Sequence, residues 1–332
     1  MTEVSLSCFQ SFQCIAGACP DTCCAGWEVD LDDDAVRRYR SIPGPLGDEI
    51  RSAICQEDGY TFFRLKNGQC PFLNKEKLCR LILELGEDAL SVTCREHPRF
   101  WEEYGMRRET CLSISCPEAA RLLLEEPLVL LQQETDEPAP EDSTPDPEFL
   151  AQLLDVRQAL LALTQSRRSL TEQLALALDA AEHGIMLPAE GEITPALWDA
   201  VPAPPLRLAL SEYLTAMEAI EFTRPQLKEL LPQVVSAGVP LPLSEPEAED
   251  DGSRLLFYFL YRYALRGVWS GLVVEKIAFS VYSTAAILAL SQHMNGTDSH
   301  QRLLNAAVLY SREVEHSPEN LELLYEHLCS VI

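Results

Sequence analysis

The sequence predicts a mainly α-helical protein, in which a Cys-rich metal-binding N-terminal module is followed by an all-α helical domain. Three observations support this. Eleven of the twelve cysteines lie between Cys8 and Cys116, an acidic proline-rich stretch follows them, and leucine and alanine then recur at helical spacing. We therefore divide the chain into a Cys-rich module at residues 1–125, a linker at 126–148 and an all-helical domain at 149–332.

Within the Cys-rich module, only short elements are expected. Helices are predicted at residues 30–39, 79–85 and 117–125, and a short strand at 61–65. Cys116 directly precedes Pro117, so it takes the N-cap position of the third helix. The positive end of that helix is expected to lower the pKa of the Cys116 thiol and to favour metal ligation.

The remainder of the chain is predicted to contain helices alone. No convincing strand series or internal repeat is found, and a second acidic linker is expected at 244–252. Residues 254–293 form either one long helix or two helices joined near 267–271. The complete set of predicted helices is 149–164, 170–183, 206–222, 225–237, 254–293, 301–313 and 318–329.

The most apolar part of the chain, residues 255–294, is interrupted by charged side chains. Its longest uncharged piece, 277–292, is shorter than the ~20 residues that a membrane-spanning helix needs, so a buried core helix is expected. Residues 1–10 show no basic start followed by an apolar run, as a secretory signal would. We expect a cytoplasmic protein.

The charge balance is strongly acidic, with 26 basic and 52 acidic residues. The net charge is −7 in the Cys-rich module and −19 in the rest of the chain. A field of this sign repels nucleic acid and anionic membranes, so we expect neither as a partner, and it attracts cations and basic protein segments. It also serves simple solubility.

The clustered cysteines are the main functional signal. A reducing cytosol disfavours disulfides, so a dense thiol cluster there indicates a metal-binding or catalytic site. Thiolates are soft ligands that select zinc, copper(I) or iron–sulfur clusters. Four separate stretches with irregular spacing suit an iron–sulfur cluster wrapped by loops, and the thiols outnumber the four ligands of one zinc, but zinc stays open as an alternative. The thiols concerned are Cys14, Cys19, Cys23, Cys24, Cys70, Cys79, Cys94, Cys111 and Cys116.

Other residues give weaker signals. Arg95 and Arg99 follow closely after Cys94. They could bind an anionic part of a cofactor, or they could form ordinary surface ion pairs. Trp27 is expected to anchor the core, and Cys329, which lies on a helical leucine pattern, is expected to be a core residue. Fingerprints of dinucleotide-binding, P-loop, zinc-protease and serine-hydrolase sites are absent. The Cys-x3-Cys-x2-Cys triplet of radical S-adenosylmethionine enzymes is incomplete, because residue 26 is glycine.

Taken together, the cysteine segments resemble the flagellin lysine-N-methylase family. The resemblance covers about residues 8–125, and its Cys-Cys element and CPFL motif also look like those of small zinc- or iron-chelating domains. The matching text is FQCIAGACPDTCCAGW from Phe12 to Trp27, CPFL from Cys70, LC at 78–79 with ELG from Glu84, TC at 93–94 with PR at 98–99, and SCPEAAR from Ser115 to Arg121.

The resemblance implies methyl transfer from S-adenosylmethionine to lysine side chains of flagellin or another lysine-bearing protein, in an enzyme with a cysteine-bound iron–sulfur cluster of the 4Fe–4S type. A lysine amine must lose its proton before it attacks, and Glu118 is the candidate catalytic residue. The alternative is a non-catalytic zinc- or iron-chelating module with a helical interaction domain. The ligands that fall on the family pattern are Cys19, Cys23, Cys24, Cys70, Cys79, Cys94 and Cys116, followed by Cys14 and Cys111.

Overall fold

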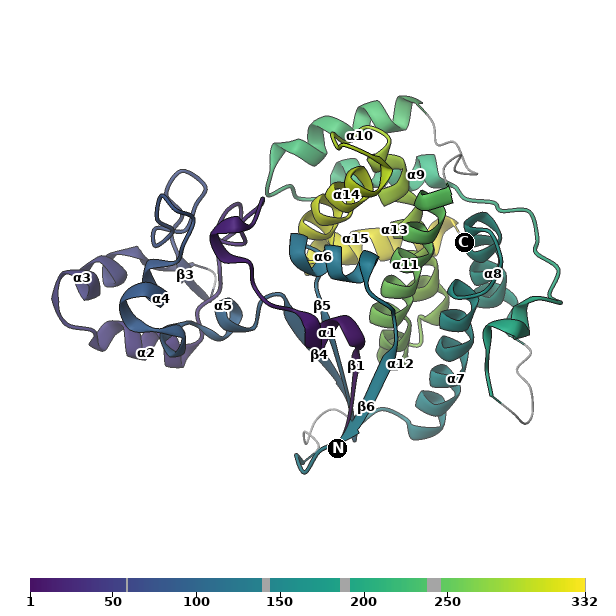
Figure 1. Cartoon of the computed structure of the whole chain (residues 1–332), viewed down its shortest axis with the longest axis horizontal. Coiled ribbons are helices and arrows are strands. Elements are labelled where there is room, and N and C mark those ends of the chain that lie inside the picture. Colours follow the sequence, from purple (N-terminus) through teal and green to yellow (C-terminus); the bar gives the residue numbers. More distant parts are fainter. Residues whose placement is uncertain (58, 139–143, 186–191, 238–245, 332) are drawn as a thin grey trace.

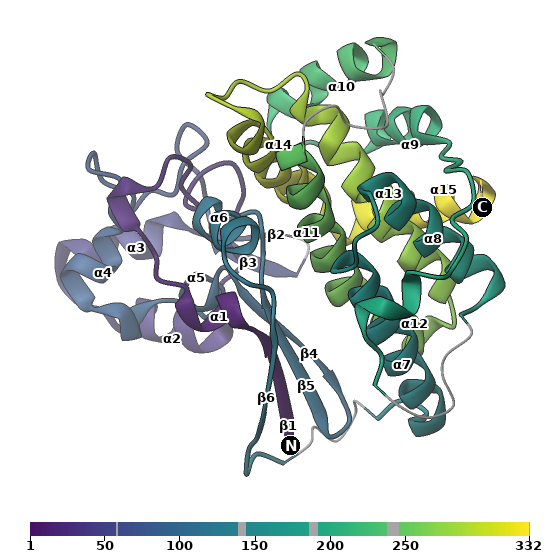
Figure 2. The ribbon, with the colours of Figure 1, turned by 45° about the vertical axis from the view of Figure 1, so that its right-hand side comes forward.

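The computed structural model describes residues 1–57, 59–138, 144–185, 192–237 and 246–331. The chain forms two lobes of unequal size (Figure 1). The small lobe carries short helices and loops from the first hundred residues, and the large lobe is a bundle of helices. A four-stranded sheet lies between the small lobe and the bundle and extends away from the loops of the small lobe (Figure 2).

The sheet combines strands from the beginning and the end of the Cys-rich module with one strand from the predicted linker. Its order is β4 (Arg99–Tyr104), β5 (Arg107–Leu112), β1 (Thr2–Leu6) and β6 (Leu130–Glu134). β4 and β5 form an antiparallel hairpin, whereas β1 runs parallel to β5 and antiparallel to β6. The prediction that the chain has no strand series is therefore wrong, and β6 lies inside the predicted linker at 126–148.

The small lobe has its own compact core. It contains α2 (Asp33–Ser41), α3 (Gly44–Ala53), the hairpin of β2 (Ile54–Glu57) and β3 (Tyr60–Phe63), α4 (Arg80–Leu85) and α5 (Val92–Glu96). The Asp32 side chain caps α2 by accepting a hydrogen bond from the Ala35 amide. The core consists of Leu31, Ala35, Val36, Tyr39, Ile50, Ala53, Phe63, Phe72, Leu81 and Leu90, and Cys70, Cys79 and Cys94 pack against it.

Most of the helices predicted for the large lobe are present in the structure. The large lobe is built from α7 (Pro147–Thr164), α8 (Leu170–His183), α9 (Leu210–Ala216), α10 (Pro225–Ala237), α11 (Pro246–Tyr263), α12 (Gly267–Ser270), α13 (Val273–Ser291), α14 (Ser299–Val314) and α15 (Pro318–Val331). Two predictions differ from the structure. Helix α9 is shorter than the predicted helix at 206–222. The linker predicted at 244–252 is instead helical from Pro246 onward, where it forms the first turns of α11, and residues 244 and 245 lie outside the described residues.

The break between the two central helices lies where the glycines predicted it. Helices α11 and α13 are separate, and Gly271 between them adopts the left-handed conformation with φ of 75°. Helix α13 is long and apolar enough to cross a membrane by length and composition, but 78% of its apolar window is buried inside the protein. It packs against α8, α11 and α14, which confirms the predicted core helix.

One hydrophobic core joins the sheet to the bundle across residue 125, the predicted end of the Cys-rich module. It includes Leu6 of β1, Leu112 of β5 and the apolar face of α6 (Pro117–Glu125) together with the bundle helices. The Tyr261 hydroxyl of α11 donates to the backbone carbonyls of Val4 and Thr110, at 3.2 Å each. The sheet therefore belongs with the bundle, and the small lobe projects from it.

Candidate metal centre

The four cysteine segments converge where the small lobe meets the large lobe. The Cys70 amide donates to the Cys24 carbonyl at 2.8 Å, which joins the first segment to the second. Cys79 is the N-cap residue of α4, Cys94 lies in α5, and Cys116 is the N-cap residue of α6, as the sequence predicted for Cys116. The structure therefore brings eight of the nine predicted ligand cysteines to one region.

These eight thiols form two groups. The lobe group consists of Cys24, Cys70, Cys79 and Cys94, and each of the last three interacts electrostatically with Cys24. Burial raises the pKa of the Cys70 thiol to about 12 and that of Cys94 to about 11. These thiols are thus held protonated at neutral pH unless a metal displaces their protons.

The junction group consists of Cys14, Cys19, Cys23 and Cys116. Cys116 interacts electrostatically with Cys19 and Cys14, and Cys23 interacts with Cys116 and Cys14. The pKa of the Cys116 thiol is raised, not lowered as predicted. Burial outweighs the stabilising backbone amides of Ala119 and Glu118 at the helix N-terminus.

Cys23 and Cys24 connect the two groups. Contact between the two thiols lowers the pKa of Cys24 and raises that of Cys23. Because the two thiols titrate as a coupled pair, the first proton leaves the pair more readily than it would leave an isolated buried thiol. Easier ionisation of the pair favours ligation of a soft metal.

Two arginines of the large lobe hold the loop that carries the junction group. Arg224, at the start of α10, donates to both carboxylate oxygens of Asp21 at 3.0 Å and to the Ala25 carbonyl at 2.7 Å. Arg312 of α14 lies 2.8 Å from Asp21 Oδ2, and its Nε donates to the Ser115 carbonyl at 2.8 Å. The sequence analysis missed both residues, although an arginine on the otherwise apolar face of 301–313 was a usable signal.

Aromatic and polar side chains fill the space beside the junction group. The Trp27 ring contacts the rings of His97 and His316, with centroids 5.7 Å and 4.9 Å away. His316 Nε2 hydrogen-bonds to the hydroxyls of Ser113 and Ser115 at 3.0 Å and 2.8 Å. Burial lowers the pKa of His97 to about 4, so its ring is neutral at pH 7. Trp27 thus packs against these two histidines as a half-buried side chain, whereas an anchor in the core was expected.

The structure places the ninth predicted ligand elsewhere. Cys111 is 2% exposed in the core of the large lobe, where its nearest thiol partner is the equally buried Cys8. Burial raises its pKa well above the ordinary value. Cys111 therefore behaves as a core residue of β5 and belongs to neither thiol group. Cys329 is exposed in α15, where a core position was expected.

The predicted cofactor and catalytic residues are engaged in local contacts. Arg95 pairs with Glu96 at 3.1 Å, and Arg99 lies over the Phe12 ring, 4.9 Å from its centroid. Glu118 of α6 accepts two hydrogen bonds from Arg121, at 2.7 Å and 2.9 Å. Both carboxylate oxygens of Glu118 are therefore already engaged by Arg121.

The thiol groups fit a metal in chemistry but are not arranged around a single ion. Within the described ranges, no three Cys, His, Asp or Glu side chains form the ligand set of one metal ion. Sulfurs around one zinc, at bonds of ~2.3 Å, would lie about 4 Å apart.

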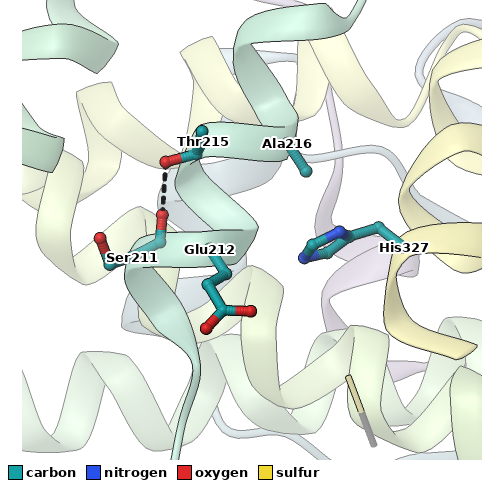
Figure 3. Close-up of a pocket in the computed structure, with 5 residues that line it drawn as sticks. All are labelled: Ser211, Glu212, Thr215, Ala216 and His327. Atoms are coloured by element: carbon teal, nitrogen blue, oxygen red, sulfur yellow. Dashed lines mark hydrogen bonds between the residues drawn. The ribbon is translucent and has the colours of Figure 1, made fainter. Parts of the chain in front are cut away.

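A surface cavity is lined by residues of α9 and α15, which carry none of the thiols of the two groups. It has a volume of about 390 Å³ and is lined by Ser211, Glu212, Thr215 and Ala216 around α9, and by His327 of α15 (Figure 3). A second cavity of about 130 Å³ lies between Leu128, α7 and α11. Both are lined by residues outside the two thiol groups.

The fold and the site together define a mainly α-helical protein whose cysteine thiols gather between a small lobe and a helical bundle. Known proteins share part of this chain. It is 33% identical over 123 residues to the flagellar biosynthetic protein FliU of Salmonella muenchen, covering 35% of this chain and 73% of FliU. It is equally identical to the lysine-N-methylases of Salmonella typhimurium and Salmonella choleraesuis, where the match spans 31% of their length. No family model matches the sequence, and no solved structure is significantly similar.

The chain thus belongs to the flagellin lysine methylase family, which includes FliU and the lysine-N-methylases. This confirms the family resemblance inferred from the cysteine segments.

Proposed function

We propose that this protein is a cytoplasmic protein-lysine N-methylase that acts on flagellin, with S-adenosylmethionine as methyl donor and an iron–sulfur cluster of the 4Fe–4S type bound by cysteine. The observation that carries the proposal is family membership together with the gathering of eight of the motif thiols at one place. Zinc is the alternative metal.

In the proposed reaction, the neutral amine of a lysine attacks the methyl carbon of the sulfonium. The bond from that carbon to sulfur breaks, its electron pair stays on sulfur as S-adenosylhomocysteine leaves, and the new ammonium loses a proton to a base or to water. The bound cluster would supply an electron-accepting, anionic centre. A free lysine has a pKa near 10.4, so the protein must also help to remove its first proton.

Glu118 is not well prepared for that proton transfer, because Arg121 occupies both of its carboxylate oxygens. The net charge of the whole protein has two opposite effects on a lysine substrate. A net charge of −26 attracts a protonated lysine, yet the same field disfavours loss of the proton. The acidic surface therefore suits recruitment of a basic substrate segment, and deprotonation needs a local group at the methyl-transfer site.

A labelling experiment tests the activity. Protein reconstituted anaerobically with iron and sulfide is incubated with flagellin and methyl-labelled S-adenosylmethionine, and lysine modification is measured by mass spectrometry. We expect label on lysine that disappears in the Cys24→Ser variant. Cys329→Ser, which changes an exposed cysteine outside both thiol groups, is the matched control and should retain full activity. Unlabelled flagellin in the presence of an intact cluster would refute the methylase proposal.

A second candidate is a non-catalytic zinc- or iron-chelating module with a helical interaction domain. It is favoured by the position of the two cavities described, since neither is lined by a thiol-group cysteine. Calorimetry with S-adenosylmethionine distinguishes the two, because only the methylase requires a binding site for it. A colourless, zinc-containing protein that binds no S-adenosylmethionine would support the chelating module.

A further inference from the structure

The cavity between α9 and α15 lies on the large lobe, on helices that carry none of the thiols of the two groups. Ser211, Glu212, Thr215 and Ala216 line it from α9, and His327 lines it from α15 (Figure 3). We propose that it binds the ammonium end of an unbranched aminoalkyl chain. The proposal goes beyond the proposed function, because it concerns binding alone and stands whether or not the protein transfers methyl groups.

The wall formed by α9 is held in place by the core. Tyr213, Leu214 and Met217 on the inner face of this segment are fully buried. The Tyr213 hydroxyl hydrogen-bonds to the Tyr310 hydroxyl of α14 at 2.8 Å. Residues three and four positions apart share one face of a helix, so burial of this face turns the polar lining residues outward, where they are exposed. The wall is therefore formed before any ligand arrives.

The polar groups of the lining can accept hydrogen bonds. Among the residues that the structure describes, Glu212 forms no ion pair, so its carboxylate is available to a cation. Thr215 Oγ1 donates its proton to the Ser211 carbonyl at 2.8 Å, which leaves the lone pairs of this oxygen as acceptors. An ammonium group donates three hydrogen bonds and accepts none, so it matches this lining in kind.

The imidazole of His327 gives a second observation. Its Nε2 is buried and has no hydrogen-bond partner in the protein. Buried polar atoms are nearly always hydrogen-bonded, so this nitrogen needs a partner that the chain does not supply. The ring extends from α15 towards α9, where Glu212 lies (Figure 3). With the imidazole proton on Nδ1, Nε2 accepts a hydrogen bond from a ligand in the cavity.

Charge and size distinguish an aminoalkyl chain from other small ligands. The lining has one carboxylate and no lysine or arginine, so a phosphate or carboxylate would meet Glu212 without a compensating cation. Glu212 and His327 are fewer than the three or more ligands that a bound metal ion needs. The volume of about 390 Å³ lies within the range of ~300–1,000 Å³ for small-molecule sites and leaves room for the alkyl chain beside Ala216.

Two sources supply such a chain, namely the lysine side chain of a protein segment and a free aliphatic diamine. Titration of the full chain by calorimetry, without metal or S-adenosylmethionine, distinguishes them. The probes are the N-acetyl, N-methylamide derivative of lysine, cadaverine as the diamine, and the corresponding norleucine derivative, which keeps the straight alkyl chain but lacks the amine. We expect saturable binding of an amine probe and none of the norleucine derivative. Tighter binding of the lysine derivative assigns the cavity to protein lysines, and tighter binding of cadaverine assigns it to a free diamine.

Two variants locate the binding site. Glu212→Gln removes the charge, and His327→Phe keeps a ring but removes the acceptor, so we expect each to weaken binding by about tenfold or more. The matched controls are Glu218→Gln, which makes the same charge change in the neighbouring turn Met217–Ala219, and His293→Phe, at an exposed histidine outside the lining. We expect each control to change affinity by less than about twofold. Circular dichroism verifies that each variant is folded, and Glu212→Gln, at an exposed position, carries the test if His327→Phe is not.

Absence of saturable binding of both amines would overturn the proposal. So would binding of the norleucine derivative as tight as that of the lysine derivative, or an equal loss of affinity in Glu212→Gln and Glu218→Gln. Because no methyl donor is present, these outcomes are independent of the labelling experiment that tests methyl transfer.

Discussion

Glu109 is a buried carboxylate in a chain that carries twice as many acidic as basic residues. Burial opposes its ionisation, but Arg157 and Arg107 outweigh burial, so the pKa of Glu109 is lowered. Arg157 Nη2 donates to Glu109 Oε1 at 2.6 Å, and Arg107 Nε donates to the same oxygen at 2.6 Å. Since Arg157 belongs to α7 and Glu109 to β5, this pair connects the bundle to the sheet.

Removing one partner of this pair should destabilise the protein strongly. In Arg157→Leu, the carboxylate of Glu109 stays buried and keeps only Arg107, so we expect the free energy of unfolding to fall by about 3–5 kcal/mol. Urea unfolding followed by circular dichroism measures it. Arg37→Ala, which breaks the exposed ion pair with Asp34, is the control and should change stability by less than about 1 kcal/mol. Equal losses in the two variants would show that burial of the pair does not matter.

The same carboxylate should contribute to acid sensitivity. Its folded-state pKa lies below its unfolded-state value, so its stabilising contribution is complete above about pH 4.3 and is lost as the pH falls through the folded-state pKa. We expect Glu109→Gln to be less stable than the wild type at pH 7 and the difference to shrink towards pH 3. Thermal unfolding at a series of pH values checks this. A difference that stays constant with pH would mean that ionisation of Glu109 is not involved.

The cysteines of the site were accessible to sequence reasoning, whereas their supporting residues were not. Residue type and clustering alone predict thiols as metal ligands, and eight of the nine cysteines predicted in this way lie where the two lobes meet. Cys111 was misplaced because it lies in β5, which was not predicted and in which the four residues 109–112 are all buried. Arg224 and Arg312 were missed because they approach Asp21 from about 200 and 290 residues away in the chain.

At the scale of elements, the sheet depends on contacts that local sequence patterns do not encode. Helices α8 and α10 begin and end where periodicity and caps predicted, because those signals are local. The sequences of β4 and β5 are RFWEEY and RRETCL, in which charged residues interrupt the alternation of apolar and polar residues that is typical of a strand. β1 finds its partners more than 100 residues later. Strand pairing of this kind is decided by tertiary packing.

Tyr261 is the side chain by which α11 reaches the two central strands. In Tyr261→Phe, the ring still packs, but the hydroxyl no longer bonds to the Val4 and Thr110 carbonyls, so we expect a loss of about 1–2 kcal/mol in unfolding free energy. Tyr60→Phe is a matched control, because the Tyr60 ring is 67% exposed. Chemical denaturation of both variants gives the comparison. An effect of Tyr60→Phe as large as that of Tyr261→Phe would contradict the assigned role.

At the scale of the whole molecule, charge governs which partners can approach. A net charge of −26 creates a long-range field that accelerates the approach of basic segments and is screened over ~10 Å at 0.1 M salt. If flagellin is the substrate, its lysine-bearing surface has to meet this field before any specific contact forms.

Salt should therefore weaken substrate recruitment. We expect the association rate with flagellin, measured by surface plasmon resonance, to fall at least tenfold between about 0.02 M and 0.5 M salt, with a much smaller change in the dissociation rate. Acetylated flagellin, whose lysines carry no charge, serves as the control and should show little salt dependence. A flat response with native flagellin would mean that the acidic surface serves solubility alone.

The position of β1 has a consequence for biosynthesis. This strand is made before β5 and β6, yet it lies between them in the sheet, and their residues follow at 107–112 and 130–134. At ~5–20 residues per second, the ribosome needs on the order of ten seconds to deliver them. During that interval all four cysteine segments emerge before the sheet that separates the small lobe from the bundle is complete. One edge of β1 therefore stays unpaired until synthesis has passed β5 at residue 112, and its other edge until synthesis has passed β6 at residue 134.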